Sequence, residues 1–211
     1  MLFEFAELPP SLPYKLLTAT VVPRPIAWVM TCDGQGRLNL APFSFFNVMS
    51  GDPPIVCLGI GRRPEGPPKD SLNNIRETGI LRIHLVPHDL AAAMNVSAIA
   101  FPPGVNEAEQ AGLTLVDDGQ PLPRVRGCPV AFHCRLQQWV EVGKQQGIAV
   151  AEVLNAFIED HLVLNAERGH IDTPQLDLIA RMHGSGWYSR PEQWFQLERM
   201  SPQDWELNRQ S

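Results

Sequence analysis

Cysteine is scarce in this 211-residue chain, and none of its cysteines belongs to a paired motif. The four are dispersed along the chain as Cys32, Cys57, Cys128 and Cys134. This spacing excludes a zinc ribbon and a thioredoxin-like redox motif, so we expect buried free thiols. His84 and His88 are close in sequence, but Pro87 would break the helix needed to pair them on one face. No metal site is therefore predicted.

Positive charge is also scarce, because 17 Lys and Arg residues face 23 Asp and Glu residues, for a formal charge of -6. Proteins that bind nucleic acids usually present a basic face, so no nucleic-acid partner is expected. No window of the sequence reaches the roughly 18 apolar residues of a membrane helix. The first residues, MLFEFAELPP, lack the basic region of a secretory signal. These absences predict a cytoplasmic protein with no membrane partner.

The chain does contain a succession of strands separated by turn residues. Residues 26–31 are rich in apolar side chains, and the following CDGQGR has the composition of a hairpin turn. Residues 38–50, LNLAPFSFFNVMS, are expected to return as one antiparallel strand, followed by a buried strand at 55–61. Two long strands are expected at 129–143 and 147–160. This order favours an antiparallel barrel or sandwich over a parallel sheet.

Helices are expected to be few and short. One is predicted at 13–20, a second begins at Asp70 or Ser71 and ends at Gly79, and a third covers DLAAAMNVSA. The alternation in ILRIHLV predicts a half-buried strand with Arg82 and His84 on its outer side. The loop-rich segment 101–127 is expected to lie across the surface. No internal repeat is present, and the whole chain is expected to form one domain.

Residues 60–79, IGRRPEGPPKDSLNNIRETG, place three cations on one loop of an acidic chain. The loop is not a P-loop, because Lys69 is followed by Asp70 instead of Ser or Thr. It is not a dinucleotide fingerprint either, because Pro64 stands where a glycine is required. Both familiar phosphate-binding motifs are therefore excluded.

The same loop nevertheless has the parts of a site for one phosphate. The free N–H groups and the dipole at a helix N-terminus favour an anion. The cations Arg62, Arg63 and Lys69 add guanidinium forks and a point charge, and Ser71 adds a hydroxyl donor. The alternative is that the two arginines are solvated and pair with neighbouring carboxylates.

Four motifs occur in the order PRPIAWV, NLAPFSFFN, DPP and GRRPEGPPKDSLNNI. Through them, residues from about 22 to 160, and GSGWYSR near Tyr188, the chain resembles the flavin reductase-like, FMN-binding split-barrel family. That family includes flavoredoxin and the flavin reductase components of two-component monooxygenases. The resemblance implies a mainly β (α+β) fold, an antiparallel Greek-key split β-barrel with a few short helices. It also implies a homodimer with FMN near the dimer interface, where the N-terminal and C-terminal extensions of the 1–211 domain pack.

The resemblance also implies two groups of FMN-binding residues. Those bordering the isoalloxazine ring would be Thr31, Ser44, Phe45, Phe46 and Asn47. Those holding the phosphate would be Arg62, Lys69 and Ser71, with Arg63 and Asp70 nearby. The FSFF run suits a flavin, whose dimethylbenzene end prefers apolar contact while its pyrimidine end needs hydrogen-bond partners. Along one strand Phe43 and Phe45 would point to the same side, and Phe43 is expected in the barrel core.

Five further residues are candidates for contact with the flavin. Arg24, stiffened by two flanking prolines, would reach the flavin or a partner subunit, or it forms a salt bridge at the rim. Asn95 would approach the cofactor across the dimer. His183, Trp187 and Tyr188 would cover the flavin or line the substrate pocket, or the two aromatics belong to the subunit interface.

As to function, the resemblance implies an FMN-dependent oxidoreductase, most simply an NAD(P)H:flavin reductase with NADH or NADPH as co-substrate. The flavin carries the hydride chemistry in such a protein, so no catalytic side chain is predicted. The alternatives are a flavoredoxin-type electron-transfer protein and a non-catalytic FMN-binding module. A monooxygenase or an electron-transfer protein is a possible partner.

Overall fold

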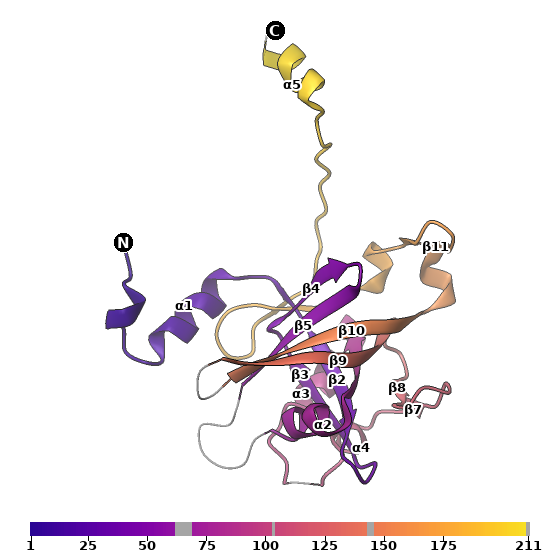
Figure 1. Cartoon of the computed structure of the whole chain (residues 1–211). Coiled ribbons are helices and arrows are strands. Elements are labelled where there is room, and N and C mark those ends of the chain that lie inside the picture. Colours follow the sequence, from indigo (N-terminus) through magenta and orange to yellow (C-terminus); the bar gives the residue numbers. More distant parts are fainter. Residues whose placement is uncertain (62–68, 103, 143–145, 210–211) are drawn as a thin grey trace.

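The computed structural model describes residues 1–61, 69–102, 104–142 and 146–209. Its main feature is one antiparallel sheet of seven strands (Figure 1). In chain order these are β2 (Ala27–Cys32), β3 (Leu38–Phe43), β4 (Phe46–Gly51), β5 (Pro54–Gly61), β6 (Ile80–Leu85), β9 (Val130–Val142) and β10 (Gln146–Ile158). Within the sheet their order is β3-β2-β6-β9-β10-β5-β4.

The sheet closes on itself because its two edge strands are joined by a very short connection. β3 and β4 stand at opposite ends of the strand order, yet only Ser44 and Phe45 separate them in sequence. The two edges must therefore meet, which closes a twisted sheet into a barrel. The expected antiparallel barrel is confirmed. The expected single strand over residues 38–50 is wrong, because the chain bends at these two residues and passes from one edge of the sheet to the other.

The helices are short, as predicted. They are η1 (Phe5–Glu7), α1 (Leu12–Thr20), α2 (Asp70–Thr78), η2 (His88–Leu90), α3 (Ala91–Val96), α4 (Glu107–Gln110), η3 (Asp160–Leu162), η4 (Pro174–Leu176) and α5 (Pro202–Arg209). There are also three small sheets. In the first, β13 (Ala180–Arg181) lies between β1 (Arg24–Pro25) and β14 (Tyr188–Ser189). The other two pair β7 (Leu115–Val116) with β8 (Arg124–Val125) and β11 (Val163–Asn165) with β12 (His170–Ile171). In Figure 1, α1 and the segment that carries α5 both project from the barrel.

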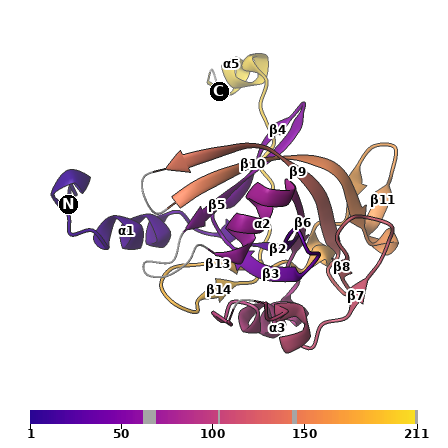
Figure 2. The same cartoon turned by 60° about the horizontal axis from the view of Figure 1, so that its bottom comes forward.

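One face of the sheet encloses the barrel core, and α2 fills the core from one side (Figure 2). Leu72 and Ile75 of α2 are buried against strand residues such as Val29, Leu58 and Ile83. Burial of each such side chain contributes about 1.5–3 kcal/mol relative to exposure. The helix ends as predicted at Gly79, which adopts the left-handed conformation at φ 71°.

The outer face of β2, β3 and β6 is also buried, under α3, α4 and the segment 113–128. Trp28 and Met30 of β2 pack there against Leu122 and Val125, and all four are fully buried. The Trp28 indole also donates to Ser97 Oγ at 2.8 Å, which fixes the end of α3. Residues 101–127 thus run over the outside of the sheet with most of their described residues at least partly exposed, but Ala108, Leu122 and Val125 are buried and form a second layer of core that was not predicted.

This covering segment also corrects the prediction for β6. The alternation is confirmed, since Leu81 and Ile83 face the barrel core. Arg82 and His84, however, are 1% and 0% exposed, so the strand is buried on both faces. An apolar layer over this face was not predicted, because two of its side chains are polar. Their burial is tolerated because both have hydrogen-bond partners in the covering segment.

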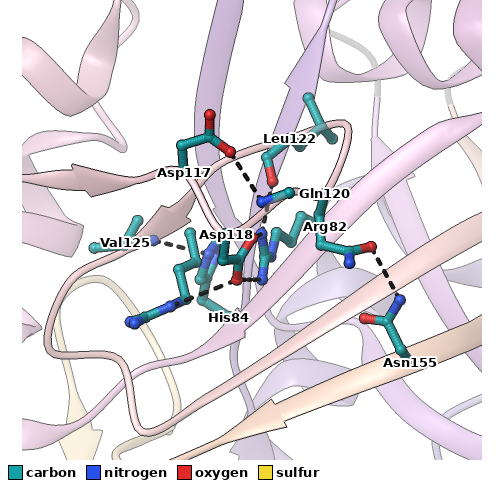
Figure 3. Close-up of polar contacts among 10 residues, drawn as sticks. Arg82, His84, Asp117, Asp118, Gln120, Leu122, Val125 and Asn155 are labelled. Carbon is teal, nitrogen blue, oxygen red and sulfur yellow. Dashed lines mark hydrogen bonds and ion pairs between the residues drawn. The ribbon is translucent and has the colours of Figure 1, made fainter.

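Those partners form a network with the segment 115–128 (Figure 3). Arg82 donates to both carboxylate oxygens of Asp118, at 2.7 and 2.6 Å, and to the carbonyl of Leu122 at 2.7 Å. His84 Nδ1 lies 3.1 Å from the Trp28 carbonyl, and Nε2 accepts from the backbone N–H of Val125 at 3.0 Å. The imidazole therefore carries its proton on Nδ1 and is neutral, because a protonated Nε2 would face another N–H.

Three further observations concern the cysteines, metal ligands and membrane helices. All four cysteines are free; Cys128 and Cys134 are buried, whereas Cys32 and Cys57 are partly exposed. Among the described residues, no group of three or more His, Cys, Asp and Glu side chains is placed to hold a metal ion. In that same part of the chain, no helix has the length and apolar character needed to cross a membrane.

The His84 contacts predict a loss of stability in mild acid. Burial lowers the pKa of His84 to about 4, from 6.5 in the unfolded chain. The unfolded state therefore takes up a proton first as the pH falls, and the free energy of unfolding should decrease by about 3 kcal/mol between pH 6.5 and pH 4. Urea denaturation at half-unit pH intervals measures this decrease.

The control is His161→Gln, which removes an exposed imidazole and should leave the acid decrease intact. His84→Gln should lower stability at pH 7 and flatten the decrease. Part of the slope remains with His133, whose pKa burial also lowers. Asp118 acts only at lower pH, because its carboxylate pKa is held below 3.8 by Arg82. An unchanged acid decrease in His84→Gln would contradict the assignment.

Candidate functional site

A cavity of about 470 Å³ lies beside the connection between β3 and β4, and we call it the corner cavity. Its walls come from the end of α1, from β1, from the start of β4 and from the paired strands β5 and β10. The described residues that line it are Leu17, Val21, Pro23, Arg24, Pro25, Ser44, Phe45, Phe46, Asn47, Met49, Cys57, Gly59, Val142, Gln146, Gly147 and Ile148. Four of the predicted ring-binding residues, Ser44 to Asn47, are therefore brought together on one wall.

The bend at Ser44 and Phe45 depends on close contact with β5. The Gly59 N–H donates to the Phe45 carbonyl at 2.7 Å. A Cβ atom at position 59 would lie only 2.9 Å from Phe45 Cβ, a distance that side-chain carbons do not adopt. Glycine at this strand position therefore permits the approach of the two backbones.

The bend also separates the phenylalanines that one strand would have placed together. Phe43 is buried in the barrel core, as predicted. Phe45 is instead 39% exposed and lies 6.1 Å from the Tyr14 ring of α1. The two side chains point to different environments, and Phe45 joins α1 to the cavity wall.

Arg24 holds together three segments at the rim of the corner cavity. Its guanidinium donates to the carbonyls of Thr18 at 2.8 Å, Val21 at 2.7 Å and Met182 at 2.9 Å, and its Nε lies 3.5 Å from Ser44 Oγ. Two of these carbonyls belong to the C-terminal end of α1, where a cation complements the helix dipole. The rim salt bridge considered for Arg24 is not what the structure shows, because its strongest contacts are backbone carbonyls.

The predicted phosphate-binding residues that the structure describes, Lys69, Asp70 and Ser71, do not line the corner cavity. Arg62 and Arg63 lie outside the described residues. Lys69, Asp70 and Ser71 line a second cavity of about 130 Å³ at the start of α2, which we call the helix cavity. Neither Asp70 nor Ser71 caps the helix, because Lys69 occupies the N-cap position and makes no capping bond through its side chain.

Ser71 and Lys69 also have partners within the protein. Ser71 is 2% exposed, and its hydroxyl lies 2.8 Å from the amide of Asn39. That amide satisfies both neighbours when its oxygen accepts from Ser71 and its nitrogen donates to Glu107 Oε1 at 3.2 Å. The Lys69 ammonium lies 5.2 Å from the centre of the Phe43 ring. Among the described residues that line the helix cavity, Lys69 is the cation.

Thr31 is in neither cavity. It is fully buried beneath α2, and its hydroxyl accepts from Asn74 Nδ2 at 3.1 Å. Asn95 is exposed on α3 and lines neither cavity. For both residues, contact with a flavin stays a prediction that the arrangement of this chain alone does not support.

His183, Trp187 and Tyr188 lie on the β13–β14 hairpin. The His183 and Trp187 rings are stacked, with centres 5.9 Å apart, and Trp187 is 63% exposed. Tyr188 packs under the guanidinium of Arg181, 4.8 Å from its ring centre. The hairpin reaches the corner cavity through β1, whose Arg24 and Pro25 pair with Arg181 and Ala180 of β13, and through the bond from Arg24 to Met182. Its role as a cover for the flavin remains a prediction.

Several residues of the corner cavity were not predicted. They are the α1 residues Leu17 and Val21, then Met49 and Cys57, and the β10 residues Gln146 to Ile148. One signal in the sequence pointed to them, because Gly59 and Gly61 interrupt a strand pattern where a backbone or a ligand approaches closely. In the sheet, Gly61 pairs with Gln146 and Ile60 with Gly147.

The Arg24 contacts predict a measurable cost when they are removed. Arg24→Ala should lower the free energy of unfolding by on the order of 3 kcal/mol, because three backbone carbonyls in buried or partly buried contacts lose a charged donor. Arg37→Ala is the matched control, since it removes an exposed arginine whose ion pair with Asp33 contributes under about 1 kcal/mol. Urea denaturation compares the two. Equal losses in both variants would show that the Arg24 contacts contribute little.

Known proteins of similar sequence and structure point to the same fold. A model of the flavin reductase like domain matches residues 19–173. A protein of Deinococcus radiodurans is 44% identical over 210 residues, which cover 97% of this chain and 92% of that protein. The chain is also similar to a solved structure from Shewanella frigidimarina, described as a flavin reductase with a split barrel domain. The TM-score is 0.80 at 20% identity, and 95% of this chain and 100% of that chain are covered.

Two solved structures are more similar in sequence. Nitrilotriacetate monooxygenase component B from Bacillus cereus has a TM-score of 0.85 and 28% identity, over 93% of this chain and 98% of that chain. The 2-nitrobenzoate 2-nitroreductase NbaA from Pseudomonas fluorescens has a TM-score of 0.85 and 26% identity, over 96% and 98%. The barrel, the cavity beside its corner and the matched family model all agree with one family. The chain belongs to the flavin reductase-like family and has its split-barrel fold.

Proposed function

We propose that this chain binds FMN with the isoalloxazine ring in the corner cavity and acts as an NAD(P)H:flavin reductase. The observation that carries the proposal is the character of this cavity. Its volume of about 470 Å³ is in the range of small-molecule sites. Most of its walls are apolar, and polar groups are confined to a few positions, among them Ser44, Asn47 and Gln146. A flavin ring needs this combination.

The side chains of the cavity bind and orient but do not exchange protons. No carboxylate, imidazole or amine is among the described residues that line it. Burial raises the pKa of the Cys57 thiol, which therefore stays protonated at neutral pH. When bound, FMN would supply the redox chemistry, since its ring accepts hydride from a reduced nicotinamide. The apolar residues Leu17, Phe46 and Met49 would exclude water from the site of transfer.

The phosphate would be held outside the corner cavity, by the loop that begins after Gly61. Gln146, which pairs with Gly61, lines the corner cavity, and Lys69 lines the helix cavity. The loop between Gly61 and Lys69 therefore links the two cavities along the chain. Arg62, Arg63 and Lys69 would contact the phosphate, with Asp70 and Ser71 at the start of α2.

The proposed partners follow from the same reasoning. A homodimer would bring a second subunit to the exposed apolar rim of the corner cavity. Component B of the Bacillus cereus nitrilotriacetate monooxygenase is a structural neighbour, which supports a monooxygenase as the electron-accepting partner. The nitroreductase from Pseudomonas fluorescens supports direct reduction of a small molecule as a further outcome of the same chemistry.

The first test is the absorbance spectrum of protein purified without added cofactor. We expect flavin bands in the parent, and their loss or strong reduction in an Arg62→Ala, Lys69→Ala double variant. Each charge-assisted phosphate contact contributes on the order of 1.5–3 kcal/mol, so each loss should weaken FMN binding by about tenfold or more. Arg126→Ala with Arg168→Ala removes the same charge from exposed positions outside both cavities and should retain the bands.

A second readout on the same proteins locates the ring. FMN at ten times its Kd should slow alkylation of Cys57 about tenfold by mass action, because this thiol lines the corner cavity. Cys32 is also partly exposed but lies outside the cavity, so its alkylation should not change. Equal protection of both thiols, or of neither, would contradict the placement of the ring.

The second test asks whether the bound flavin accepts electrons from nicotinamide. Anaerobic mixing with NADH or NADPH should bleach the flavin within about a second, as expected for an enzyme turning over at ordinary rates. Free FMN mixed with the same nicotinamide is the control and should stay yellow. Bleaching only with a reduced protein donor would instead identify an electron-transfer protein of the flavoredoxin type. Lasting yellow colour with every donor would identify a binding module.

A further inference from the structure

The rim of the corner cavity is an exposed apolar face. Leu17 and Val21 of α1 are 49% and 58% exposed, Met49 of β4 is 60% exposed, and Val142 at the end of β9 is 45% exposed. All four line the cavity. Large apolar side chains gathered around a cavity mouth mark a surface that another element covers.

The chain has an element of matching character in its C-terminal arm, residues 191–209. Phe195, Leu197 and Trp205 on this arm are 87%, 83% and 53% exposed. The arm begins next to an ion pair in which Arg190 donates to both carboxylate oxygens of Asp177, at 2.5 and 2.8 Å. Its origin is thus fixed to the barrel, while the backbone of the segment that carries α5 projects away from the barrel (Figure 1).

The origin of the arm is close to the corner cavity. Pro191 and Trp194 line a cavity of about 290 Å³ together with Pro23 and Pro25, and these two prolines also line the corner cavity. The first residues of the arm therefore already pack against their own barrel. The apolar residues that follow are exposed, and the backbone that carries them extends away from the barrel in Figure 1.

The length of the arm suits a second molecule. Residues 191–201 precede α5, and eleven extended residues span roughly 36 Å, which is about the width of a domain of this size. A two-fold pair of chains places the same surfaces of both copies opposite each other. Each copy would then supply one arm and one apolar rim, and each exposed apolar group on the arm would meet an exposed apolar group on the rim.

We propose that the C-terminal arm of a second copy of this chain crosses the mouth of the corner cavity and completes its wall with Phe195 and Leu197. The proposal rests on the proposed function only in so far as the covered cavity holds FMN. Each cavity is then incomplete in a single chain. The arm determines how easily a flavin leaves and how large a second substrate can enter.

The test places the photo-crosslinking amino acid benzoylphenylalanine at position 195 of the full-length chain. Copies labelled with nitrogen-15 and unlabelled copies are mixed, irradiated and digested, and crosslinked peptides are identified by mass. We expect mixed-isotope crosslinks to the residues around the cavity mouth, which are 12–21, 45–49, 142 and 146–148. Crosslinks within a single chain only, crosslinks to other segments, or no crosslinks would each overturn the proposal. This readout does not require bound flavin, so it is independent of the proposed function.

A second measurement tests the consequence for the cavity. The Phe195→Ala, Leu197→Ala double variant should release FMN about tenfold faster than the parent. Leu164→Ala, which truncates a 66% exposed leucine on β11, is the matched control and should release FMN at the parental rate. Unchanged release in the double variant would overturn the role of the arm in covering the cavity. Mixed-isotope crosslinks in a protein that never binds FMN would support the arm exchange and overturn the proposed function instead.

Discussion

The short connection at Ser44 and Phe45 is the constraint on which the barrel and the candidate site both depend. It joins the two edge strands of the sheet, so the sheet must close into a barrel. The same residues form one wall of the corner cavity. The connection can be this short because Gly59 lets the backbone of β5 approach Phe45, with a hydrogen bond of 2.7 Å. The same connection therefore closes the barrel and forms a wall of the cavity.

Much of the fold could be predicted from the sequence, because its signals are local. The turn residues and the apolar alternation located β2, β5, β9 and β10, and the left-handed Gly79 ended α2 where expected. The bend between β3 and β4 could not be predicted, since LNLAPFSFFNVMS contains no glycine, and its one proline, Pro42, lies inside the edge strand β3, where proline is tolerated. That bend depends on contact with β5, and the residues of the bend do not by themselves show this contact.

The burial of Arg82 and His84 was missed for a related reason. Alternation shows which side chains share a face, but it does not show what covers that face. Here the cover is the segment 115–128, whose Asp118 and Val125 accept from and donate to the two polar side chains. For the site, the wall at Ser44 to Asn47 was predicted, whereas α1 and β10 were not. Those elements reach the cavity only through tertiary packing.

The distribution of charge gives the last step of the argument. Among the described residues that line the corner cavity, Arg24 carries a guanidinium, and this group donates to the carbonyls of Thr18, Val21 and Met182. It therefore has little capacity left for an anion. The proposed phosphate contacts come from the cations that follow β5 in the sequence, before α2. An apolar cavity for a ring and cations for its phosphate are what a flavin mononucleotide requires, since its two ends have opposite solvation needs. A neutral flavin without the phosphate would contact only the corner cavity, and it should bind more weakly because the phosphate contacts are missing.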